Sequence, residues 1–169
     1  SLQMFHIKAS NNNAQNGDGG FLFARLAGPI LLSDVSIKRS GTGHEGGGGG
    51  VGVYSTQIAL ERVSLKHCRA GERGGGAILL GGEAEGHLLD CDLDDNSAEG
   101  ASGGHISCKA SSLVVHGKGF WLKWPGQEPI FPNALILSAF NSTSMTHGVA
   151  SINGGAVSCI ASSSKQILN

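Results

Sequence analysis

Apolar residues in the middle of the chain follow a spacing that neither an α-helix nor one straight strand would give. Leu60, Val63 and Leu65 are separated by three positions and then by two. A one-residue corner near Arg62, between two short strands, explains this spacing because it turns all three side chains toward the same interior. A polar turn and a glycine run follow, and then a further apolar strand at 77–80. The pattern predicts three short strands joined by tight corners, which together make one coil.

The same unit recurs along the chain at a constant spacing. Leu32 lies 28 positions before Leu60, and Leu60 lies 28 positions before Leu88. A second apolar position repeats in the same way at Ile37, Leu65 and Leu93. Glycines ahead of the third strand recur at intervals of 30, 26 and 28, at Gly20, Gly50, Gly76 and Gly104. Repeats of this length indicate a solenoid, in which one unit cannot bury its apolar face alone. Since each unit consists of strands and turns, we expect an all-β parallel β-helix whose coils pair at a spacing of about 4.8 Å.

The composition agrees with a coil made of strands and corners. Glycine supplies 28 of the 169 residues, which suits three corners in every coil, and the length suits one domain, 1–169. Charged residues make up 15% of the chain and the net charge is −1. The sequence has no basic stripe to attract nucleic acid. It also has no apolar run near the ~18 residues that a transmembrane segment needs.

Both ends of the sequence fall within a coil of this register. The segment 5–10 aligns with 35–40, and Ile167 follows Gly155 by 12 positions, as the first strand follows the glycine in earlier repeats. No capping helix is recognised, although solenoids need their open ends covered. We therefore expect about five to six uncapped coils of about 26–30 residues each. The chain would be a segment of a longer protein, or its ends would be covered by a protein partner.

Two short motifs resemble a known family. Gly75-Gly76-Ala77-Ile78 and Gly154-Gly155-Ala156-Val157 resemble the Gly-Gly-Ala-[Ile/Leu/Val] repeat of chlamydial-type polymorphic outer membrane proteins. The companion Phe-x-x-Asn repeat is present in degraded form, for example at 93–96 and 140–143. The resemblance implies a right-handed parallel β-helix of the pectin-lyase-like kind. It also implies the uses of that fold in surface adhesins and autotransporter passengers, and, in sister enzymes, outward Asp residues on the coil strands.

Acidic side chains gather on the third full repeat, at Asp90, Asp92, Asp94 and Asp95. Asp92 and Asp94 are expected to point outward, with Asp90 at the corner. Such carboxylates could bind Ca²⁺ or act as the acid and base of a glycosidase. However, the neighbouring repeats offer Lys38 and Lys66 rather than a second acidic row, so we favour a solvated face paired between coils. The four aspartates remain weak candidates for a metal site.

The polar column Ser10, Ser40, Cys68 and Asn96 is expected at one corner of successive coils. Small polar side chains at a corner can hydrogen-bond the backbone or one another along the stack. We interpret this column as structural.

The repeat falters between Gly104 and Gly155, which are 51 positions apart. This segment is either two coils or one coil with a long excursion, and we favour two coils with an irregular segment at about 119–133. Three aromatic residues lie there: Trp121, Trp124 and Phe131. They either seal a corner or form a contact patch for a partner or a sugar ring.

The four cysteines form no C-x-x-C pair, so a zinc ribbon is not indicated. Cys91 occupies an inward position, as a small apolar residue would. Cys108 and Cys159 both lie four residues after the glycine of the third strand. If one coil separates them, a Cα separation of ~5 Å permits a disulfide, whereas two coils place them ~10 Å apart. We expect free buried thiols.

Two further motifs carry little information. The glycine run 46–52 lacks the Gly-Lys-Ser/Thr ending of a phosphate-binding loop and is interpreted as a flexible corner. Asn141-Ser142-Thr143 matches the N-glycosylation pattern.

Three hypotheses for function remain open. The first is a non-catalytic scaffold that docks to a protein partner or to neighbouring subunits of a larger assembly. The second is a passenger segment of a secreted or cell-surface adhesin. The third is a carbohydrate-binding or carbohydrate-active module. We favour the first, expect no enzyme activity and no cofactor, and expect an extracellular or cell-surface location, with an accessory subunit inside an organelle as the alternative.

Overall fold

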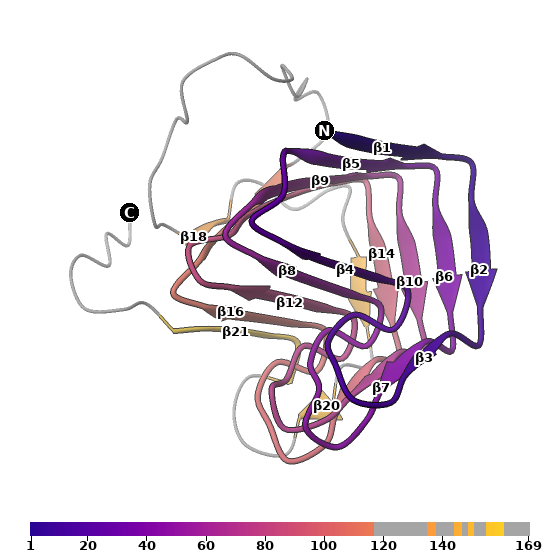
Figure 1. Cartoon of the computed structure of the whole chain (residues 1–169), viewed down its shortest axis with the longest axis vertical. Helices are drawn as coiled ribbons and strands as arrows, with labels where there is room; N and C mark the ends of the chain where they lie inside the picture. Colours follow the sequence, from indigo (N-terminus) through magenta and orange to yellow (C-terminus); the bar gives the residue numbers. More distant parts are fainter. Residues whose placement is uncertain (117–134, 138–143, 147–148, 151–154, 161–169) are drawn as a thin grey trace.

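The chain winds into stacked coils made of strands and turns. The computed structural model describes residues 1–116, 135–137, 144–146, 149–150 and 155–160, and within these it contains no helix (Figure 1). Four coils are complete: coil 1 (2–25), coil 2 (30–54), coil 3 (57–81) and coil 4 (85–109). Later strands add part of a fifth coil. The predicted all-β parallel β-helix is confirmed, with fewer complete coils than the five to six expected.

Four parallel sheets run along the stack, and each takes one strand from every complete coil; after coil 4, sheet A gains two strands and the other sheets gain one each. Sheet A contains β1 (Leu2–Phe5), β5 (Ile30–Ser33), β9 (Gln57–Glu61), β13 (Glu85–Leu89), β17 (Ser112–His116) and β18 (Leu135–Leu137). Sheet B contains β2 (Lys8–Ser10), β6 (Ser36–Lys38), β10 (Ser64–Lys66), β14 (Asp92–Asp94) and β19 (Ser144–Thr146). Sheet C contains β3 (Asn13–Ala14), β7 (Gly41–Thr42), β11 (Arg69–Ala70), β15 (Ser97–Ala98) and β20 (Val149–Ala150). Sheet D contains β4 (Leu22–Arg25), β8 (Val51–Tyr54), β12 (Ile78–Gly81), β16 (Ile106–Lys109) and β21 (Val157–Ile160).

The strand register confirms the period of 28 residues. Leu60 pairs with Leu32 on one side and Leu88 on the other. The second predicted column is formed by Ile37, Leu65 and Leu93, each fully buried. Stacked aliphatic side chains of this kind fill the interior, so the core of every coil depends on the coils above and below it.

The predicted one-residue corner is confirmed between sheets A and B. Arg62 has a φ of 51°, and the same position in the neighbouring coils is Asp34, with a φ of 56°, and Asp90, with a φ of 53°. A residue in this left-handed region turns the chain sharply between two strands. It therefore brings the apolar residues on both sides of the corner to one interior.

Each coil has four strands rather than the three predicted. The polar turn after sheet B contains the two-residue strands of sheet C, such as β11. Strands this short offer too few positions for an alternating pattern to show in the sequence.

The first coil lies two residues out of the predicted alignment. Ala9 pairs with Ile37, and Ser10 pairs with Lys38. Ser10 therefore does not belong to the polar corner column, and Asn12 takes that position opposite Ser40. Because side chains alternate with a period of two, a shift of two residues keeps the same face inward and leaves the apolar pattern intact.

The rest of the polar column is structural, as predicted. The buried Asn96 side chain accepts the Cys68 backbone N–H through Oδ1 at 2.8 Å and donates from Nδ2 to the Leu65 carbonyl at 2.9 Å. In the first two coils Asn12 Nδ2 donates to Ser40 Oγ at 3.3 Å. Burial raises the pKa of the Cys68 thiol to about 11, so this sulfur stays protonated at neutral pH. The column ties the corner of one coil to the next.

The segment between Gly104 and Gly155 adds one layer to sheets B, C and D rather than the two that two coils would add, and its extra strand, β18, lies in sheet A alone. Cys108 on β16 is the direct register partner of Cys159 on β21, with a Cα–Cα distance of 4.3 Å, and the two form a disulfide. The expectation of two coils is therefore wrong, and so is that of free thiols at these two positions. The separation of 51 residues in the sequence accommodates one coil and an excursion. Cys68 and Cys91 are free and buried, as expected.

We predict that loss of the disulfide weakens the fold without changing its architecture. Replacing both residues in C108A/C159A releases a loop of 51 residues. In the chain-entropy model this lowers the free energy of unfolding by about 4 kcal/mol. Urea unfolding followed by circular dichroism measures the difference. A reducing agent should destabilise the wild-type chain by the same amount and leave the double variant unaffected. A transition midpoint that is indifferent to reductant in the wild-type chain would contradict the bond.

Candidate functional site

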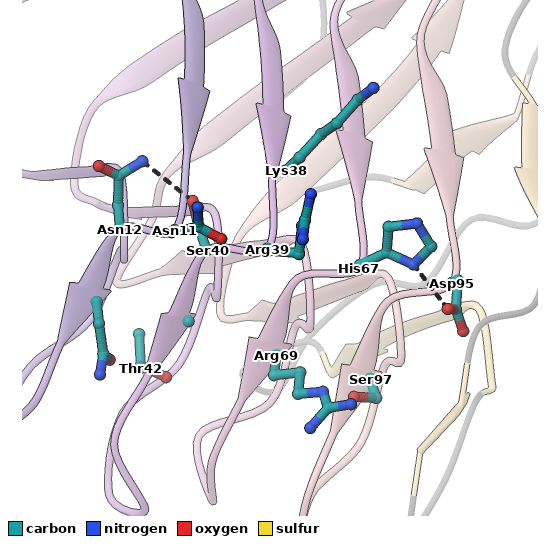
Figure 2. Close-up of a pocket in the computed structure, with 12 residues that line it drawn as sticks. Asn11, Asn12, Lys38, Arg39, Ser40, Thr42, His67, Arg69, Asp95 and Ser97 are labelled. Carbon is teal, nitrogen blue, oxygen red and sulfur yellow. Dashed lines mark hydrogen bonds and ion pairs between the residues drawn. The ribbon is translucent and has the colours of Figure 1, made fainter.

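A polar hollow lies on the outside of the coil, where sheet B meets sheet C (Figure 2). We call it the corner hollow. Its volume is about 880 Å³. Its lining comes from coils 1 to 4: Asn11, Asn12, Asn13, Lys38, Arg39, Ser40, Gly41, Thr42, His67, Arg69, Asp95 and Ser97. Amide, hydroxyl, imidazole and charged groups make up its side chains, and none of the described lining residues is Phe, Tyr or Trp.

A column of left-handed residues builds the floor of the corner hollow. The corner between sheets B and C is Asn11, Arg39, His67 and Asp95 in successive coils, with φ values of 58°, 52°, 54° and 48°. Each is exposed, because the preceding residue ends a strand of sheet B and the following one turns inward. The corner therefore presents four different side chains at regular intervals along the stack.

Positive charge dominates the middle of the corner hollow. Lys38 and Arg39 extend from the corner of coil 2, and Arg69 lies in the next coil beside Ser97 (Figure 2). All three cations are exposed, and none has an ion-pair partner among the residues that the structure describes. The single carboxylate of the lining, Asp95, lies 2.7 Å from Nδ1 of His67. Three cations against one carboxylate leave the corner hollow positive.

The predicted acidic cluster is spread over three parts of the surface. Asp90 lies at the corner of sheets A and B, and Asp92 and Asp94 are half-buried on the outer face of β14. Asp92 lies 2.6 Å from Lys66 Nζ in the neighbouring coil, and this hydrogen bond raises the pKa of Lys66. The predicted pairing between coils is confirmed here. Asp95 alone reaches the corner hollow.

A second charged cluster lies on sheet D, where the carboxylate of Asp18 is almost completely buried. It accepts the Gly47 backbone N–H at 2.7 Å, the Tyr54 hydroxyl at 2.8 Å and Nη1 of Arg73 at 2.9 Å. Burial and the Asp18 hydrogen bond raise the pKa of Tyr54 to about 12. Because three donors already occupy this carboxylate, it ties together the loops of coils 1, 2 and 3 rather than serving as a free base.

The glycine run 46–52 is not the flexible corner that its composition indicated. Every residue in it is buried, and Gly47 donates its N–H to Asp18. A Cβ at Gly49 would collide with backbone atoms of Gly76 and Arg69. Close packing against the next coil requires glycine at position 49, and a positive φ of 63° favours it at Gly48.

Several predicted residues cannot be placed. Trp121, Trp124, Phe131 and Asn141 lie outside the described residues. In the part of the chain that the structure describes, no group of three or more His, Cys, Asp or Glu side chains could hold a metal ion. The same part contains no helix long and apolar enough to cross a membrane.

Sequence reasoning missed the corner hollow. Lys38 and Arg39 are adjacent in the sequence, but Arg69 lies in the next repeat at a different repeat position, so the three cations form no periodic pattern. The signal that could have found them is the residue that follows each sheet B strand, since Arg39 and His67 occupy a left-handed corner that usually favours Gly, Asn or Asp.

Comparison with known proteins adds no family to these findings. No family model, no curated protein and no solved structure matches the chain.

Proposed function

We propose that this chain is a non-catalytic interaction module, a β-helix that docks to a partner protein through the corner hollow. The observation that carries the proposal is a group of three exposed cations in one polar hollow, Lys38, Arg39 and Arg69, which have no carboxylate partner in the part of the chain that the structure describes. On the same side of the coil, Lys66 is neutralised by Asp92. Exposed charges without partners at one concave site favour recognition of a charged partner.

The architecture supports this use. Continuous backbone ladders along four sheets hold the lining residues of four coils at fixed intervals. Preformed sites lose little conformational freedom on binding, which favours affinity. A non-catalytic role is also supported by the Asp18 carboxylate, whose hydrogen bonds to Gly47, Tyr54 and Arg73 leave it no part as a free acid or base.

The proposal predicts that the corner hollow contacts a specific protein in the native assembly. The photo-reactive residue p-benzoylphenylalanine is placed at Asn13, which is exposed in the hollow. The matched control carries it at Gln57, which is exposed on sheet A. After irradiation in an extract of the source cells, we expect a discrete protein adduct from position 13 and not from position 57. Excess unlabelled chain should abolish it.

Two outcomes would overturn the proposal. One is the same adducts from both positions, which would indicate random contact. The other is no protein adduct from position 13 in an extract where the labelled chain is folded, as judged by its circular dichroism before mixing.

A further inference from the structure

We propose that the corner hollow binds an extended acidic peptide segment of the partner protein. This inference rests on the proposed function and specifies the chemistry of that partner. It follows from the order of charges along the hollow, its length and the kind of polar groups that line it.

The charges change in a fixed order along the stack. Coil 1 contributes the amides of Asn11, Asn12 and Asn13, and coils 2 and 3 contribute Lys38, Arg39 and Arg69. Coil 4 contributes Asp95, which is paired with His67. A ligand that fits this order carries its carboxylates opposite coils 2 and 3, where charge-assisted hydrogen bonds to arginine and lysine are available. It carries neutral polar groups toward coil 1.

The length of the corner hollow suits a short extended segment. Four coils at a spacing of about 4.8 Å span about 14 Å. An extended peptide covers this distance with about four residues, and its alternate side chains lie on the same face. One or two carboxylates can therefore face the cations at once.

The polar groups favour a peptide over a sugar chain. Each asparagine amide offers both a donor and an acceptor, as a peptide group does, so it can pair with the backbone of an extended segment. Among the described residues the lining has no Phe, Tyr or Trp ring on which the apolar face of a sugar could stack, and its imidazole, that of His67, is paired with Asp95.

Arg39 offers a variant that separates binding from folding. Its φ of 52° is unfavourable for arginine, and the same corner position is Asn11 in coil 1 and Asp95 in coil 4. Asparagine tolerates this conformation better. R39N should therefore keep or raise the melting temperature while it weakens ligand binding, which is opposite to the effect of losing a structural residue.

The test measures binding of a fluorescent octapeptide in which glutamate and serine alternate, by fluorescence anisotropy. We expect saturable binding that weakens as salt is added, and no binding of the matched peptide with glutamine in place of glutamate. K38A, R39N and R69A should each weaken binding about fivefold, and the triple variant about a hundredfold. D95N, which removes the only carboxylate of the lining, should strengthen it about twofold.

Arg25 provides the matched control, because it is an exposed arginine on sheet D outside the corner hollow. R25A should leave the affinity for the glutamate peptide unchanged. If R25A weakened binding as much as K38A, R39N or R69A, the effect would come from net charge alone, and the inference would be overturned. Tighter binding of an oligogalacturonate with as many carboxylates, dependent on the same three cations, would replace the peptide by an acidic sugar chain. If the position 13 adduct forms but the glutamate peptide does not bind, the proposed docking function is retained and the proposal of an acidic peptide ligand is wrong.

Discussion

Replacing Leu65 with aspartate is expected to unfold the module at neutral pH. Leu65 is fully buried and lies between Ile37 and Leu93 in the register of sheet B. An aspartate here places a carboxylate among aliphatic side chains, with no cation in the column to pair with it. We expect a loss of about 4 kcal/mol or more, which exceeds what most single substitutions cost. Circular dichroism during urea unfolding measures this loss.

A matched aspartate on the other face of sheet B provides the control. Ser36 lies in the neighbouring coil, one residue before Ile37, and its side chain points away from the core. Its register partner is Lys8 on one side and Ser64 on the other. S36D should change the free energy of unfolding by no more than about 0.5 kcal/mol. A midpoint for L65D close to that of S36D would show that the predicted aliphatic column is not the core.

The sequence predicts those parts of the fold in which a repeat position must be buried in every coil. The position of Leu60 holds leucine in three successive coils, because each coil needs an apolar residue at that point of the interior. The sequence predicts a corner at Arg62 because the apolar residues before and after it do not fit the alternation of one straight strand. Both features are local consequences of burial, so they leave a pattern in the sequence.

The alignment of coil 1 and the number of coils after Gly104 could not be predicted in the same way. Ile7 and Ala9 both point inward, so the pattern fits two registers that differ by two residues. The pairing of Cys108 with Cys159 depends on where a long excursion returns to the stack. Sequence spacing alone does not contain this information, because a loop of variable length adds residues without adding a coil.

The corner hollow escaped prediction for a different reason. The function proposed for it rests on Lys38, Arg39 and Arg69 having no ion-pair partner among the described residues, and an absence leaves no periodic pattern. The sequence predicts a site at the acidic cluster because its members lie close together in sequence, although Asp92 is neutralised by Lys66 in the folded chain. Proximity between coils, and not proximity in sequence, decides which charges remain available to a partner.

Replacing Gly76 with alanine is expected to destabilise the fold by at least about 3 kcal/mol, although a methyl group is the smallest possible addition. A Cβ at this position would collide with the Gly104 carbonyl and would lie 2.5 Å from the Ser97 nitrogen and 2.6 Å from its carbonyl oxygen. All of these are backbone atoms, which cannot rotate away as a flexible side chain can. The loss is therefore steric, since Gly76 does not have the positive φ that makes neighbouring Gly75 conformationally special.

Gly17 separates this steric effect from the general effect of removing a glycine. A Cβ at Gly17 meets nothing within 4 Å, and its φ is not in the left-handed region. G17A should therefore be neutral or stabilise the fold by up to about 1 kcal/mol, because it restricts the unfolded chain without straining the folded one. Urea unfolding of both variants compares them directly. Equal effects at the two positions would mean that the repeated glycine serves only flexibility. A large loss confined to G76A would establish that glycine recurs in each coil because the backbone of sheet C lies too close for any side chain.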